Sequence, residues 1–238
     1  MQSAVPNWTS INKVDVRHKG APHMPTTTDT TTNPAAATAT VPAVVRPVVV
    51  RAARPTASGL DRDTLADVAV RNIGAMVDGD LDDFVALTHP RAVNREAQAE
   101  PPATRGLGPE AFLATAHWLR AAFSDLSFTI EEIVVEGDLV VTHGTMSGRH
   151  TGDFVIWTPS GEVERAFAPT GRSFTVHHAH FQRIRDGLVI EHWAVRDDQA
   201  MALQAGWIPP TPRYLLRCAL ATRAARRAAR SAQSAPTV

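Results

Sequence analysis

The chain has 238 residues, and its 24 basic and 24 acidic side chains give a formal net charge of zero. This balance provides no overall field to recruit nucleic acid or an anionic membrane, and no apolar run reaches the length of a bilayer span. The single cysteine, Cys218, excludes an internal disulfide. We therefore expect a cytoplasmic protein with no nucleic-acid partner and no integral membrane contact.

Low-complexity sequence dominates residues 1–59. A run rich in Thr, Ala, Pro and Val follows Met24-Pro25, and it holds too few bulky apolar side chains to offset the entropy lost on folding. We predict a disordered N-terminal tail over residues 1–59, a folded domain over 60–208 and a basic helical or disordered tail over 209–238.

Helical periodicity marks the first half of the folded region. Apolar residues recur there at the spacing of an amphipathic helix, and the first such stretch follows an aspartate that can cap it. His89-Pro90 stops the second stretch, and Pro109-Glu110 is a good start for the third. The predicted segments are helices from Asp61 or Asp63 to Val77, at 81–88 and at 110–122, with a loop at 91–108.

The second half alternates apolar and polar residues, as half-buried strands do. Asp186-Gly187 separates two such stretches and can supply the positive φ that a type I′ hairpin turn or a bulged loop needs. The predicted segments are strands at 127–135, 139–149, 154–157, 174–184 and 188–195, a short helix at 199–205 and a basic helix at 212–230. This order indicates an α+β fold in which a curved antiparallel sheet closes over the N-terminal helices and leaves a pocket for a small ligand.

Alternation places several histidines of the predicted hairpin on one face. In the first strand this face holds Phe174, Val176, His178, His180 and Gln182. In the second strand it holds Ile190, His192, Ala194 and Arg196. Three histidines therefore converge on a single concave surface, where we expect the chemistry.

The strand-forming half resembles the SnoaL-like polyketide cyclase and ester cyclase family. The motifs that carry the resemblance are FSDL at 123–126, EGD at 136–138, GRHTG at 148–152, RDG at 185–187 and EHW at 191–193. The similar region runs from about Leu60 to Trp207. It implies a cone-shaped α+β barrel of the nuclear-transport-factor-like, or cystatin-like, kind. It also implies a homodimer that closes a ring of an aromatic polyketide ester by intramolecular aldol condensation, without a metal or an organic cofactor.

The resemblance also directs attention to particular residues. In that family an aspartate directly after Glu-His-Trp often takes the substrate proton, but Ala194 stands at this position here. We identify His180, His192 and Asp197 as the candidate catalytic residues, because an imidazole titrates near the operating pH and Asp197 is the carboxylate nearest to the lost one. The alternatives are that both histidines are structural and that Asp197 caps the following helix.

A second group of residues is expected to contact substrate. Its members are His178, Asn94, Trp118, Phe84, Phe154 and Trp193. The aromatic members are equally typical of a hydrophobic core, and Asn94 of a turn. His178 and His180 could begin a metal site, but no third ligand lies at a suitable spacing, so we expect no metal.

The function favoured by the sequence is a cofactor-independent cyclase or isomerase. It would act on a small hydrophobic carbonyl compound by general acid–base chemistry. The alternative is a non-catalytic binding or dimerisation module of the same fold, which the missing carboxylate at Ala194 favours. For the basic C-terminal helix we expect a solvated surface or a subunit contact rather than nucleic-acid or membrane binding.

Overall fold

The computed structural model describes residues 59–234, so the predicted N-terminal tail lies almost entirely outside the described residues. The helices are α1 (Arg62–Asp78), α2 (Leu81–Leu87), α3 (Pro109–Ala122), α4 (Asp198–Gln204) and α5 (Pro212–Ser234), with 3₁₀ turns η2 (Ala97–Ala99) and η3 (Pro102–Arg105). The strands are β1 (Thr88–Asn94), β2 (Phe123–Glu136), β3 (Leu139–His150), β4 (Phe154–Trp157), β5 (Val163–Phe167), β6 (Ser173–Arg185) and β7 (Leu188–Arg196). None of the described helices is long and apolar enough to cross a bilayer.

The N-terminal helices begin where capping chemistry predicts. Asp61 caps α1 by accepting a hydrogen bond of 2.8 Å from the Thr64 amide. Asp80 caps α2 through a reciprocal capping box with Asp83. The predicted boundaries of α1, α2 and α3 are therefore confirmed to within a residue or two.

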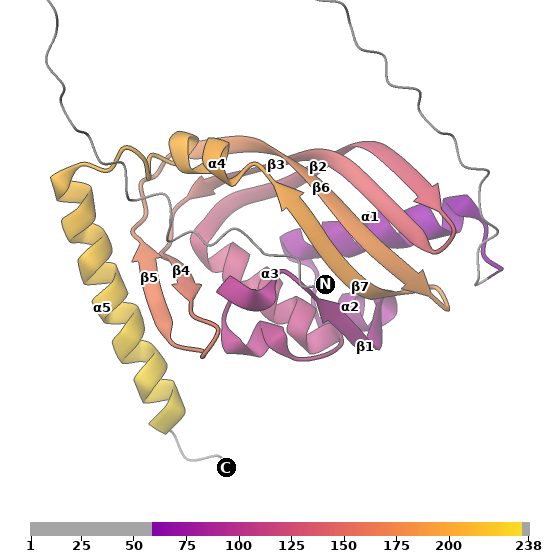
Figure 1. Ribbon diagram of the computed structural model, residues 1–238, viewed down its shortest axis with the longest axis horizontal. Helices are drawn as coiled ribbons and strands as arrows, with labels where there is room; N and C mark the ends of the chain where they lie inside the picture. The colour runs from indigo at the N-terminus through magenta and orange to yellow at the C-terminus, as the bar shows by residue number, and fades with distance from the viewer. Residues whose placement is uncertain (1–58, 235–238) are drawn as a thin grey trace, which may run out of the picture. The chain divides into compact units, whose positions relative to one another are not determined.

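The main sheet has the strand order β1-β7-β6-β3-β2, and α1 and α3 pack against it (Figure 1). Neighbouring strands are antiparallel except β1, which runs parallel to β7 with Asn94 opposite His192. The second helix ends before His89-Pro90, as predicted, but the loop predicted over 91–108 was wrong at its start, because residues 91–94 belong to β1. Pro90 lacks an amide hydrogen but is tolerated because β1 is an edge strand, paired only on its β7 side.

The β6–β7 hairpin turns at Asp186 and Gly187, whose φ angles are 53° and 77°. Both values are positive, and Arg185 pairs with Leu188 across a two-residue loop, so of the type I′ turn and the bulged loop predicted from the Asp-Gly pair the type I′ turn fits. Within the hairpin the pairing register shifts between Arg183 and Ile184. This bulge reverses the alternation in β7, so Val189 is buried in the core while Ile190 lies on the other side. The prediction that Ile190 shares a face with His192 was therefore wrong.

Two hydrophobic clusters hold the helices to the sheet. The first lies between α1, α2, α3 and the sheet, and it includes Leu65, Phe84, Phe112, Ile184 and Val189. The second lies at the other end of the sheet, and it includes Phe123, Met146, Phe174, Trp207 and Tyr214. Phe112 is fully buried, so replacing it with alanine should cost about 3–5 kcal/mol of stability.

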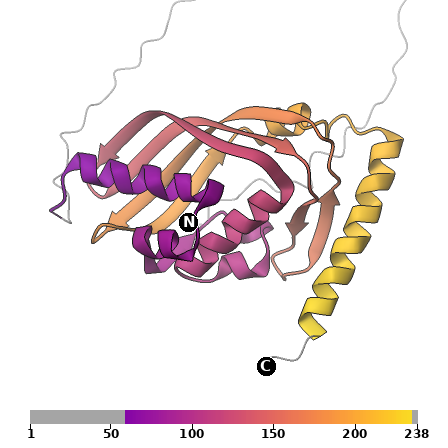
Figure 2. The ribbon, with the colours of Figure 1, turned by 180° about the vertical axis from the view of Figure 1, so that it is seen from behind.

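The C-terminal helix α5 packs along β5 of the β4–β5 hairpin (Figures 1 and 2). The Tyr214 hydroxyl donates to the Ala168 carbonyl at 3.1 Å, and Arg226 donates to the Val163 carbonyl at 3.0 Å. The opposite side of α5 exposes Leu215, Leu216 and Leu220. The predicted basic helix therefore forms and contacts the domain through one face.

Candidate active site

Three histidines meet on the inner face of the sheet, as the alternation predicts. The ring centroids of His178 and His180, two residues apart on β6, are 5.5 Å apart. The His180 ring lies 5.3 Å from that of His192 on β7, and His180 Nδ1 is 3.0 Å from His192 Nε2. Phe128 of β2 lies edge-on to both β6 histidines, while Phe112 of α3 lies against His192.

A chain of hydrogen bonds leads from this pair into the protein. His192 Nδ1 lies 3.0 Å from Asn94 Oδ1, and Asn94 Nδ2 donates to Thr115 Oγ1 at 3.3 Å. Thr115 Oγ1 in turn donates to Glu100 Oε2 at 2.7 Å. Asn94, Thr115 and Glu100 are all buried. The chain therefore connects β6, β7, β1, α3 and the segment after η2 through side chains alone.

The surroundings keep the histidines neutral. Burial, together with the positive charge of Arg196, lowers the pKa of His180 to about 4. Burial, with smaller contributions from His180 and Arg196, lowers the pKa of His178 to about 3. Burial also depresses the pKa of His192 well below its ordinary value. For Glu100, burial raises the pKa of the carboxyl, and the Thr115 hydrogen bond opposes this effect.

Several buried polar atoms beside the histidines have no hydrogen-bond partner within the described part of the chain. They are Nε2 of His180, both ring nitrogens of His178, Oγ1 of Thr142 and Oε1 of Gln182. Thr142 lies directly opposite His180 in the β3–β6 pairing. Because buried polar groups are rarely left unpaired, this concentration on one face indicates a place for water or for polar atoms of a ligand.

The position that resemblance assigns to an acid is occupied by Ala194, and a different carboxylate stands beside it. Glu96 Oε1 accepts the backbone N–H of Ala194 at 3.1 Å, and Glu96 Oε2 lies 3.3 Å from Arg196 Nη2. Arg196 also reaches Asp198 at 3.6 Å. Both oxygens of Glu96 are thus engaged, so this carboxylate holds the strand edge and the arginine.

The structure does not bring every predicted residue to the histidines. Asp197 is exposed and caps α4, its Oδ1 accepting from the Ala200 amide at 2.8 Å. Trp193 lies on the outer face of the sheet, stacked on Phe181 with ring centroids 5.3 Å apart, because alternation turns it away from His192. Phe84 is fully buried in the first hydrophobic cluster.

Of two further aromatic candidates, Phe154 packs against the second hydrophobic cluster and Trp118 contacts Phe154. The Trp118 ring lies 4.6 Å from that of Phe154, and its indole N–H donates to the Val155 carbonyl at 2.8 Å. Phe154 also stacks on Trp207, which donates to the buried His150. Of the predicted residues, the structure thus gathers His178, His180, His192 and Asn94 into one site.

Sequence reasoning missed Glu100, Thr115 and Thr142. Thr115 lies on the buried face of α3 beside Phe112 and Ala116, so a polar residue within the apolar stripe was a usable signal. Glu100 lies between η2 and η3 in a stretch without periodicity, and no pattern there marks it. Among the described residues no group of three or more His, Cys, Asp or Glu side chains is arranged to hold a metal ion.

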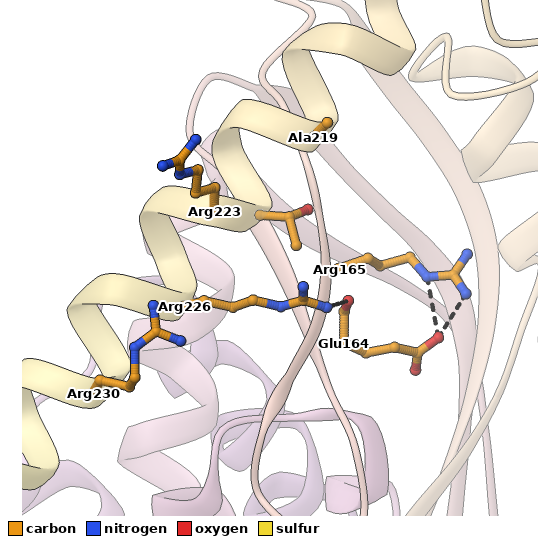
Figure 3. Close-up of a pocket in the computed structure, with 7 residues that line it drawn as sticks. Glu164, Arg165, Ala219, Arg223, Arg226 and Arg230 are labelled. Atoms are coloured by element: carbon orange, nitrogen blue, oxygen red, sulfur yellow. Dashed lines mark hydrogen bonds and ion pairs between the residues drawn. The ribbon is translucent and has the colours of Figure 1, made fainter.

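Two surface hollows lie away from the histidines. One, of about 550 Å³, lies between α5 and β5 and is lined by Arg165, Arg223, Arg226, Arg230, Glu164, Ala219 and Thr222. Figure 3 shows its arginines, with Arg165 paired to Glu164 and Arg226 reaching the Glu164 carbonyl. The other, of about 330 Å³, lies on the outer side near Arg183 and Ile190.

Comparison with known proteins gives one consistent result. The SnoaL-like polyketide cyclase family matches residues 66–205. The chain is similar to aklanonic acid methyl ester cyclase DnrD of Streptomyces peucetius, with 33% identity over 63% of this chain and 95% of the relative. It is 31% identical to nogalonic acid methyl ester cyclase of Streptomyces nogalater, over 56% of this chain and 91% of the relative. Among solved structures, TsrD from Streptomyces laurentii matches with 27% identity and a TM-score of 0.50, over 62% of this chain and 98% of that chain.

Proposed function

Because the chain belongs to the SnoaL-like polyketide cyclase family, which matches residues 66–205, we propose that it closes a ring in a polyketide methyl ester by intramolecular aldol chemistry. The substrate class comes from relatives named as cyclases of aklanonic and nogalonic acid methyl esters. The observation that carries the proposal is the buried, unpaired Nε2 of His180. We assign it the role of general base.

The hydrogen bonds fix which nitrogen of each ring carries the proton. The backbone N–H of Glu96 can only donate, and it donates to Asn94 Oδ1 at 3.1 Å. This atom is therefore the oxygen of the Asn94 side-chain amide. His192 Nδ1 must then donate to that oxygen, which leaves His192 Nε2 as an acceptor. His180 Nδ1 must therefore donate to His192, and His180 Nε2 keeps a free lone pair.

In the reaction, His180 Nε2 removes a proton from a carbon made acidic by neighbouring carbonyls. The resulting carbanion attacks a ketone carbon of the same molecule, and a carbon–carbon bond forms. The new alkoxide takes the proton back from His180, so the base is regenerated. No electrons are gained or lost overall, and acid–base groups are sufficient for this step without a cofactor.

Thr142 supports this chemistry as a hydrogen-bond donor. Its Oγ1 is buried and unpaired, and it faces the same interior as His180 across the β3–β6 pairing. A hydroxyl at this position can donate to the enolate oxygen that develops beside the base. The two unpaired nitrogens of His178 offer a second polar contact for the substrate.

Substrate reaches the base by displacing an aromatic side chain. Phe128 is half-buried and lies against both His178 and His180, with ring centroids 6.4 and 5.8 Å away. Rotation of this side chain opens Nε2 to a flat polycyclic ligand. A flat ligand replaces the lost aromatic contact with its own rings.

A homodimer in the cytoplasm belongs to the same proposal. Val134, Val141, Phe181 and Trp193 form a cross-strand row on the outer face of the sheet, and Val134 is 59% exposed. A second copy would cover this row. Sedimentation equilibrium should give a dimer for the wild type and a monomer for Val134→Glu, and a wild-type monomer would contradict this part.

Turnover of the full chain on a tricyclic keto-ester polyketide methyl ester tests the proposed activity. Chromatography with mass spectrometry should show a ring-closed product that keeps the methyl ester. His180→Gln should lower kcat by at least about a hundredfold, the usual contribution of a general base. His177→Gln is the matched control, because His177 lies on the same strand with its side chain exposed on the outer face.

The same experiment separates the alternative of a binding module. If the wild type binds the ester but releases it unchanged, the protein holds the ligand without catalysis. If His180→Gln turns over as fast as the wild type, the base is assigned to the wrong residue.

A further inference from the structure

We propose that Glu100 is a positioning residue for the histidine pair, acting through Thr115 and Asn94 to supply the negative charge that offsets the proton taken up by His180. The inference rests on the proposed function, since His180 gains a proton only if it acts as the base. It adds a residue that touches neither His180 nor the substrate.

The burial of Glu100 is the first reason. Its side chain is 3% exposed, and it is the only buried carboxylate among residues 59–232. A carboxylate removed from water needs compensating interactions. Glu100 accepts the Thr115 hydroxyl at 2.7 Å.

The direction of the hydrogen bonds is the second reason. The Thr115 hydroxyl has one hydrogen, and Glu100 at 2.7 Å is a far better acceptor than the Ala111 carbonyl at 3.4 Å. Thr115 then accepts from Asn94 Nδ2, and Asn94 Oδ1 accepts from His192. Every link donates toward Glu100, so a positive charge at the histidines and a negative charge at Glu100 polarise the whole chain in one sense.

Charged and titratable groups surround both ends of the chain. Glu100 is approached by Arg196 of β7 and by Glu96, whose charges oppose each other. His180 is approached by His178, His192 and Arg196. The positive charge of Arg196 disfavours a proton on His180 and on His192. Against these positive neighbours, Glu100 is the carboxylate that the hydrogen bonds connect to the pair.

The charge of Glu100 should matter for the base. Unit charges roughly 10 Å apart in an interior with a dielectric constant of about 20 interact strongly enough to move a pKa by about one unit. Burial raises the pKa of Glu100 itself above its ordinary value. Glu100 and the histidines therefore titrate as a coupled set.

The first test uses NMR on the resting protein and needs no turnover. The buried Nδ1–H protons of His180 and His192 should give downfield resonances, and both should shift together as Glu100 ionises. Glu100→Gln should abolish this shared step. Thr115→Val should weaken it and Thr115→Ser should restore it, because serine keeps the hydroxyl. Glu110→Gln, an exposed glutamate of the same helix as Thr115, is the control and should keep the step.

The second test uses the pH dependence of kcat/KM on the polyketide methyl ester. In wild type kcat/KM should rise several-fold as Glu100 ionises, because the base is stronger beside the negative charge, and Glu100→Gln should lack this step and stay at the lower value. A purely structural role for Glu100 would lower kcat/KM by the same factor at every pH.

The two tests separate this inference from the proposed function. If both N–H resonances show the same titration in Glu100→Gln and wild type, or show no step in wild type, Glu100 has no such role. Suppose that the step is present in wild type and that Glu100→Gln abolishes it, but that the wild type cyclises no ester. The charge coupling then stands and the proposed reaction is wrong.

Discussion

Acidification should destabilise this protein, because the folded state buries histidines in their neutral form. The pKa of His178 is about 3 against an ordinary value of 6.5, and a buried His178 therefore binds no proton at pH 4.5 while the unfolded chain does. A histidine with a lowered pKa contributes stability above pH 6.5 and loses it as the pH falls toward its folded value. Between pH 7 and pH 4.5 this loss amounts to about 3 kcal/mol for His178.

The substitution His178→Leu isolates this contribution. Urea unfolding followed by tryptophan fluorescence at pH 7 and pH 4.5 gives the free energy of unfolding at each pH. The drop between the two values should be about 3 kcal/mol smaller in His178→Leu than in wild type. Replacing the neighbouring His177, which is exposed, with leucine should leave the drop unchanged. An equal drop in wild type and His178→Leu would refute the reasoning that His178 is buried and neutral.

Three further substitutions test separate parts of the structure. Asp197→Ala should lower the free energy of unfolding by about 1 kcal/mol, because it removes the cap on the Ala200 amide. Ester turnover should stay intact. A large loss of turnover at unchanged stability would give Asp197 a catalytic role instead. Trp207→Phe should cost about 1–3 kcal/mol in denaturant unfolding, because it leaves His150 Nδ1 without the indole donor at 3.1 Å; an unchanged midpoint would show that this hydrogen bond contributes nothing. Thr142→Val should reduce kcat at least about tenfold with little change in KM if its hydroxyl donates to the enolate, and a change confined to KM would assign Thr142 to ground-state binding.

Most of the fold could be predicted from the sequence, because the patterns that mark helices, strands and turns are local. The β6–β7 hairpin follows from period-2 alternation on either side of Asp186-Gly187, and both turn residues have the expected positive φ. Strand β1 was missed because its sequence does not alternate, contains Pro90, and gains its strand character only from parallel pairing with a partner almost a hundred residues later.

The site was only partly predictable for a related reason. Alternation alone brought His178 and His180 together, and the pairing of β6 with β7 added His192. The bulge that sends Ile190 to the other face has no sequence marker within β7. The role of Glu100 could not be predicted, because it depends on a contact with Thr115 that only the fold creates. No residue near Glu100 in sequence indicates that contact.

Determining the resting tautomer of His180 tests its assignment as the general base most directly. Long-range ¹H–¹⁵N correlation NMR at pH 7 distinguishes a proton on Nδ1 from one on Nε2. The hydrogen-bond chain from His180 through His192 to Asn94 predicts neutral rings with the proton on Nδ1 in both histidines. A proton on Nε2 of His180 would leave that nitrogen no lone pair to accept a substrate proton, and would contradict its assignment as the base.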